Sequence, residues 1–188
     1  MNPEESALAA VVGVLTRLGI PYMLTGSIAS SFYGRPRATH DADMVIDPTT
    51  RQLDELIAAL TEMGFYADLD GARAALRARR QFNVIEMAHA CKIDLIVRQT
   101  RAFSETEFAR RRTCDLPFAR GVFMVSAEDS VLSKLDWARQ SDDSGRQLAD
   151  AAGIVALNPS IDRTYIARWA SVLGVADLWQ KISGNAPE

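Results

Sequence analysis

The stretch Leu24-Thr25-Gly26-Ser27, followed after residues 28–40 by Asp41-Ala42-Asp43, decides how this chain can fold. The apolar residues 22–24 predict a strand that ends at Gly26-Ser27, and residues 41–46 predict a second strand. Successive side chains of a strand alternate between its faces, so Asp41 and Asp43 point the same way. Two like charges side by side are unfavourable unless a cation neutralises them or one is protonated. Because Mg²⁺ prefers oxygen ligands and keeps open positions for water and phosphate, the pair predicts half of a phosphoryl-transfer metal site.

Gly26 and Ser27 predict a complementary site for anions. A glycine lets the backbone approach a phosphate closely. The N–H groups at the start of a helix, expected here over residues 28–33, can bind charged oxygens together with the serine hydroxyl. We therefore expect the carboxylates to hold the metal, and the metal and backbone to hold a triphosphate.

Strand and helix patterns surround this stretch over the first ~120 residues, and only helical patterns follow. Besides the segments above, the expected strands are 65–67, 82–87, 93–97 and 122–125, and the expected helices are 3–18, 48–63, 71–80, 104–112, 126–140, 145–157, 161–173 and 175–182. The pattern predicts an α+β fold, with a mixed β-sheet flanked by helices over residues 1–125 and a C-terminal helical region, 126–188, packed on that core.

Composition excludes some classes of function. The chain has 188 residues and a net charge of -3, which argues against a dedicated nucleic-acid coat because phosphate contacts need a basic excess. Neither cysteine has a metal-like spacing. The acidic start does not resemble a secretory signal, and no apolar run reaches the ~20 residues of a membrane span. We expect a cytoplasmic protein without a membrane partner.

The Gly-Ser and Asp-x-Asp pattern resembles the nucleotidyltransferase superfamily, whose best-known member is DNA polymerase beta. Gly26, Ser27, Asp41 and Asp43 match its signature, and the resemblance implies a nucleotidyltransferase fold and a third carboxylate on a later strand. Asp94, embedded in an apolar strand, is the best match because a buried carboxylate needs a partner such as a shared metal. Glu86, on the preceding expected strand, is the competing choice.

A narrower resemblance, to the toxin components of abortive-infection toxin–antitoxin systems, rests on Arg37-x-Thr39-x-Asp41-x-Asp43 and on the later Lys134 and Asp150. It implies that Lys134 contacts the triphosphate and that Asp150 orients it or the attacking group. The resemblance thus implies catalytic roles for Asp41, Asp43, Asp94 and Lys134, metal binding by the three aspartates, and nucleotide binding by Gly26, Ser27, Arg37, Thr39, Lys134 and Asp150.

The function implied is transfer of a nucleoside monophosphate from a nucleoside triphosphate to an acceptor hydroxyl, with Mg²⁺ or Mn²⁺ as cofactor. The acceptor could be a tRNA 3′ end, a protein or a small molecule, and an antitoxin protein could be a partner. The alternative is a catalytically silent module of the same fold that binds a nucleotide or a partner.

Other residues have structural interpretations. Arg110-Arg111-Arg112 is expected to be a solvated helix end that favours the helix dipole. The tryptophans at 137, 169 and 179 fall in helical patterns and predict core positions.

Overall fold

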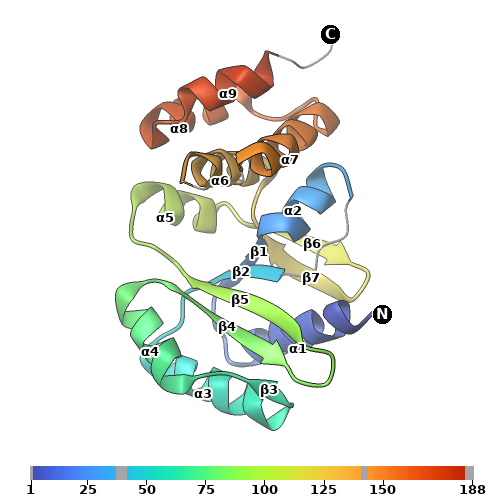
Figure 1. The fold of residues 1–188 in the computed structure, drawn as a ribbon, viewed down its shortest axis with the longest axis vertical. Coiled ribbons are helices and arrows are strands. Elements are labelled where there is room, and N and C mark those ends of the chain that lie inside the picture. Colours follow the sequence, from blue (N-terminus) through green and yellow to red (C-terminus); the bar gives the residue numbers. More distant parts are fainter. Residues whose placement is uncertain (1, 37–41, 141–143, 185–188) are drawn as a thin grey trace. The chain divides into compact units, whose positions relative to one another are not determined.

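The computed structural model describes residues 2–36, 42–140 and 144–184 (Figure 1). The chain divides into two compact units, which are treated separately. Unit 1 comprises Met1–Thr25 and Thr39–Met124, and unit 2 comprises Gly26–Ala38 and Val125–Glu188. In the described residues, no helix is long and apolar enough to cross a membrane.

Unit 1 is a mixed sheet with helices. Its strands are β1 (Tyr22–Thr25), β2 (Ala42–Ile46), β3 (Phe65–Tyr66), β4 (Gln81–Glu86), β5 (Cys91–Val97), β6 (Arg112–Leu116) and β7 (Ala119–Met124). Its helices are α1 (Pro3–Arg17), α3 (Thr50–Glu62), α4 (Leu69–Ala78) and α5 (Ala102–Ala109). The strand order is β3-β4-β5-β2-β1-β7-β6; β2 runs parallel to β5 and β1 runs parallel to β7, while the other neighbours are antiparallel. This mixed sheet confirms the predicted fold class.

One face of the sheet is an apolar core layer. Leu24, Met44 and Leu95 are fully buried, and Ile93 is 1% exposed. Along β5 the buried residues alternate with half-buried ones, which include Asp94. Helix α1 packs against β5 and α3.

Capping side chains define the starts of α1 and α3; α1 begins at Pro3 as predicted, whereas α3 begins at Thr50, two residues after the predicted start. Asn2 and Glu5 form a capping box at α1, with Pro3 at the first helical position. Thr49 and Gln52 form a second box at α3. The Gln52 side-chain amide also donates to the backbone oxygens of Leu18 (3.1 Å) and Gly19 (3.2 Å), so the start of α3 is tied to the end of α1.

The expected helix over 104–112 was wrong at both ends, because helix α5 begins at Ala102. Helix α5 ends at Ala109, and Arg112 opens the edge strand β6, which forms a hairpin with β7. Strand β6 is largely exposed, so it lacks the apolar alternation that reveals a half-buried strand. The Arg111 guanidinium lies over the rings of Phe108 (4.4 Å) and Phe123 (5.1 Å), and is therefore a packing group, not part of a solvated helix end.

Unit 2 is helical. It contains α2 (Gly26–Tyr33), α6 (Ala127–Gln140), α7 (Ser144–Leu157), α8 (Arg163–Leu173) and α9 (Ala176–Ser183). Helix α2 packs against α6 and α7, α6 against α7 and α8, and α9 against α7 and α8. The backbone after α2 approaches α7 so closely that a Cβ on Gly34 would lie 3.1 Å from the nitrogen of Ile154. Trp137 is 53% exposed, so its predicted core position was wrong, whereas Trp179 is buried.

A buried polar network joins α6 to α8. Asp129 has no exposed surface and accepts hydrogen bonds from the Ser126 hydroxyl (2.7 Å) and the Tyr165 hydroxyl (2.6 Å). The Asp129 backbone N–H in turn donates to the Ser126 hydroxyl at 3.2 Å. Because a buried carboxylate is costly without such donors, this network fixes the start of α6 against α8.

We expect Tyr165→Phe to lower the free energy of unfolding by about 1–3 kcal/mol, because Asp129 loses a donor that water cannot replace. Urea denaturation followed by circular dichroism measures this. Tyr66→Phe is the matched control, since Tyr66 is 57% exposed and should tolerate the change. Equal unfolding midpoints for both variants would contradict the assigned network.

Candidate functional site

A row of polar residues crosses the centre of the sheet in unit 1. Directly paired positions place Thr25, Asp43, Asp94 and Asn83 side by side on β1, β2, β5 and β4. Paired residues project from the same face of a sheet, and neighbouring strands lie about 4.8 Å apart. Asp43 and Asp94 are both half-buried. Two strands distant in sequence therefore bring two of the predicted carboxylates together (Figure 1).

Lys92 belongs to the same sheet face as Asp94. The two residues are separated by one position of β5, and the Lys92 Nζ lies 3.1 Å from Oδ2 of Asp94. The side chains are 38% and 14% exposed, respectively. Lys92 was missed as a site residue, although strand alternation already predicts that it shares a face with Asp94.

Glu86 lies on the opposite face from Asp94. It pairs with Cys91, whereas Asp94 pairs with Asn83, three positions earlier on β4. The Glu86 carboxylate accepts the backbone N–H groups of Ala88 (3.0 Å) and His89 (2.9 Å). Glu86 therefore caps the turn between β4 and β5, and Asp94 is the carboxylate beside Asp43.

Charge at Glu86 is stabilised by this turn. Burial disfavours the charged form, but the backbone donors of His89 and Ala88, together with the His89 side chain, hold the pKa of Glu86 below its ordinary value.

The described part of this site fits a hard cation. Asp43 and Asp94 contribute adjacent carboxylates, the oxygen ligands that Mg²⁺ prefers. In the part of the chain that the structure describes, no group of three or more His, Cys, Asp or Glu residues is close enough to hold a metal. Asp41, the remaining predicted ligand, lies outside the described residues, as do Arg37 and Thr39.

In unit 2, Gly26 opens helix α2 two residues earlier than the sequence analysis predicted. Its φ of 61° lies in the left-handed region, which a side chain disfavours. Ser27 follows and is buried. The chain thus passes directly from Thr25, the register partner of Asp43, into a glycine that begins a helix.

Two side chains of unit 2, those of Lys134 and Ser30, converge on one carboxylate oxygen of Asp150. The Lys134 Nζ lies 2.9 Å from Oδ2 of Asp150, and the Ser30 hydroxyl lies 3.3 Å from the same atom. The side chains of Lys134 and Asp150 are 8% and 12% exposed. Helices α2, α6 and α7 therefore meet at a largely buried ion pair. Ser30 was missed, although it lies one helical turn after Gly26.

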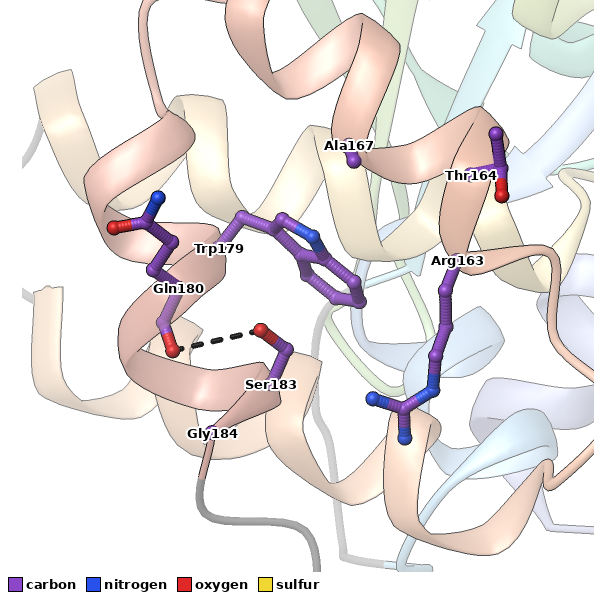
Figure 2. Close-up of a pocket in the computed structure, with 7 residues that line it drawn as sticks. All are labelled: Arg163, Thr164, Ala167, Trp179, Gln180, Ser183 and Gly184. Carbon is purple, nitrogen blue, oxygen red and sulfur yellow. Dashed lines mark hydrogen bonds between the residues drawn. The ribbon is translucent and has the colours of Figure 1, made fainter.

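Unit 2 also has an open hollow of about 490 Å³ between α8 and α9 (Figure 2). It is lined by Arg163, Thr164, Ala167, Trp179, Gln180, Ser183 and Gly184. The Ser183 hydroxyl donates to the backbone oxygen of Gln180 at 3.4 Å within it. The lining contains none of the predicted site residues that the structure describes, so we assign it no part in the chemistry.

Comparison with known proteins identifies the fold. The chain matches no model of a protein family and no curated protein. Among solved structures, it is similar to ANT(2″)-Ia in complex with adenylyl-2″-tobramycin, with 14% identity, 92% of this chain and 98% of that chain covered, and a TM-score of 0.61. It is also similar to an antigenic nucleotidyltransferase-like protein from Paracoccidioides brasiliensis, with 17% identity, 96% and 92% coverage, and a TM-score of 0.57.

The chain has a nucleotidyltransferase fold. At identities of 14% and 17%, the likeness establishes architecture, and the chemistry has to be argued from the side chains. Within this fold, the candidate functional groups are Asp43 and Asp94 in unit 1 and the ion pair of Lys134 with Asp150 in unit 2.

We expect Glu86→Gln to lower the unfolding midpoint at pH 7 while leaving divalent-cation binding intact. The depressed pKa of Glu86 contributes stability that is present above its unfolded pKa and is lost as pH falls through the folded value. The difference between wild type and variant should therefore shrink on acidification. Thermal melts between pH 3 and 7 and a Mn²⁺ titration test this; loss of cation binding would return Glu86 to the metal site.

We expect Asp150→Ala to reduce the free energy of unfolding by about 3 kcal/mol, because it leaves the buried Lys134 without its carboxylate. Adding Lys134→Met should restore much of the loss. Asp177→Ala, at an exposed position of α9, serves as the control. Urea denaturation of wild type, Asp150→Ala, Lys134→Met, the double variant and the control forms the test, and additive effects of the two site substitutions would show that the pair is not coupled.

Proposed function

We propose that the protein is a nucleotidyltransferase, which transfers a nucleoside monophosphate from a nucleoside triphosphate to an acceptor hydroxyl. The observation that carries this proposal is the direct pairing of Asp43 with Asp94 across β2 and β5. Like charges so placed destabilise a sheet unless a cation neutralises them. Nucleotidyl transfer provides a reason to keep both.

In this proposal the carboxylates bind the metal, and one of them also contacts the acceptor. Asp41, Asp43 and Asp94 bind Mg²⁺ or Mn²⁺, which when bound neutralises phosphate charge and steadies the attacking and leaving oxygens. Asp94 faces the acceptor and accepts or orients its hydroxyl proton. The acceptor oxygen forms a bond to the α-phosphorus, the bond from the α-phosphorus to the bridging oxygen breaks, and pyrophosphate leaves.

The residues of unit 2 act on the nucleotide. The backbone at Gly26 and Ser27 binds phosphate oxygens at the start of α2, and Lys134 supplies positive charge to the triphosphate. The 2.9 Å contact gives Asp150 a positioning role, because it holds the Lys134 ammonium in place. Ser30 supports Asp150 from α2. Arg37 and Thr39 are proposed as further nucleotide contacts on the sequence resemblance alone.

The acceptor defines two versions of this function. Similarity to the structure with adenylyl-2″-tobramycin supports a small-molecule acceptor. The motif resemblance supports a toxin that modifies a tRNA 3′ end or a protein, has an antitoxin partner and works in the cytoplasm. The competing function is a silent nucleotide-binding or partner-binding module of the same fold, which would bind triphosphate and metal without transferring label.

We expect the wild-type protein to transfer label from an α-³²P nucleoside triphosphate, in the presence of Mg²⁺, to one of three acceptor pools: total tRNA, total protein or aminoglycosides. Each of the four triphosphates is tested with each pool. Asp43→Ala and Asp94→Ala should each reduce transfer by about 10³-fold or more, because electrostatic stabilisation dominates this class of reaction. EDTA should abolish it.

Asp177→Ala is the matched control and should retain full transfer with an unchanged melting temperature. Circular dichroism must show that both site variants are folded. Metal and triphosphate binding without transfer to any acceptor would favour the silent module, and undiminished transfer by Asp43→Ala would overturn the assigned site.

A further inference from the structure

We propose that Lys92 is a resident counter-ion of Asp94 that weakens binding of a divalent cation until nucleotide arrives. This inference rests on the proposed function, because it takes Asp43 and Asp94 as ligands of that cation. It adds a residue that sets the affinity of the cation site and that no sequence motif indicated.

The ammonium of Lys92 contacts Oδ2 of Asp94, an oxygen that a bound cation would use as a ligand. Its Nζ is 3.1 Å from Oδ2 of Asp94, and the Asp94 side chain is only 14% exposed. Both residues project from the same face of β5, and Asp43 lies beside Asp94 in direct register. Lys92 therefore partly neutralises the paired carboxylates from within the chain.

An ammonium and a divalent ion compete for this oxygen. An ammonium carries donors only, so it cannot itself become a ligand of the incoming ion. A cation bound at Asp94 must either displace Lys92 or remain within a few ångströms of a like charge. In both cases Lys92 opposes binding of the metal alone, whereas the negative charge of a triphosphate would offset the repulsion. The expected consequence is that metal binds together with nucleotide.

The choice of residue supports a movable counter-ion. Only three of the 21 basic residues are lysines, at positions 92, 134 and 181. A lysine is a point charge on a flexible stem, while the planar fork of arginine would grip a carboxylate at two points. With 38% of its side chain exposed, Lys92 has access to solvent and can move off Oδ2.

The test is a titration of the full chain with Mn²⁺ in the absence of nucleotide. The electron paramagnetic resonance signal of free Mn²⁺ measures how much of the ion remains unbound. We expect Lys92→Met to lower the Kd by about tenfold or more, because an adjacent positive charge is removed. Lys92→Arg, which retains the charge, should not tighten binding. Lys181→Met, the same change at an exposed lysine of α9, should leave the Kd unaltered.

An unchanged or weaker Kd in Lys92→Met would overturn the inference, as would Mn²⁺ binding too weak to measure in both wild type and variant. Lys92→Gln replaces Lys92→Met if circular dichroism shows that the latter is unfolded.

Asp43→Asn and Asp94→Asn separate this inference from the proposed function. If both of these variants bind Mn²⁺ as tightly as wild type, the two aspartates are not its ligands, and the proposed function is overturned as well. Loss of affinity in both, without tightening in Lys92→Met, would overturn only the role of Lys92.

Discussion

The parallel pairing of β2 with β5 is the constraint on which the site depends. It is fixed by the apolar face of the sheet, where Met44 lies beside Leu95 and both are fully buried. A slip of one residue in either strand would turn its apolar side chains away from the core, so the register is strongly specified. The same register forces Asp43 beside Asp94 on the other face. The burial of hydrocarbon thus holds two negative charges together against their repulsion.

Unit 2 also holds charged groups away from solvent, but there a positive and a negative side chain are paired. Lys134 and Asp150 are largely buried, and their charges balance within the helical unit itself. Such a pair contributes little net stability compared with apolar packing, but it fixes the direction of the lysine because moving it would strand a buried charge. Under the proposed function, this fixed direction would hold the Lys134 ammonium in place before the nucleotide binds. In the carboxylate row, by contrast, the Lys92 ammonium offsets part of the negative charge of Asp43 and Asp94.

Local patterns were sufficient to predict most helices and strands, because apolar periodicity and the preferences of proline and glycine at helix ends act over a few residues. The sequence favoured Asp94 over Glu86 because Asp94 is embedded in an apolar strand, but the opposite facing of the two carboxylates follows only from the register of β4 against β5. Strand β6 was missed because an exposed edge strand needs no apolar alternation. Ser30 was missed because its partner, Asp150, is distant in sequence.

Fold and chemistry rest on different evidence here. Solved structures at 14% and 17% identity share the architecture, and one fold can serve several functions. A silent module would need the apolar register of β2 and β5 but not the carboxylates, because asparagine could occupy either position without the repulsion. Retaining both acids is a cost to stability that Lys92 relieves in part and that a bound cation would relieve further. The charge pattern, more than the fold, therefore favours an active enzyme.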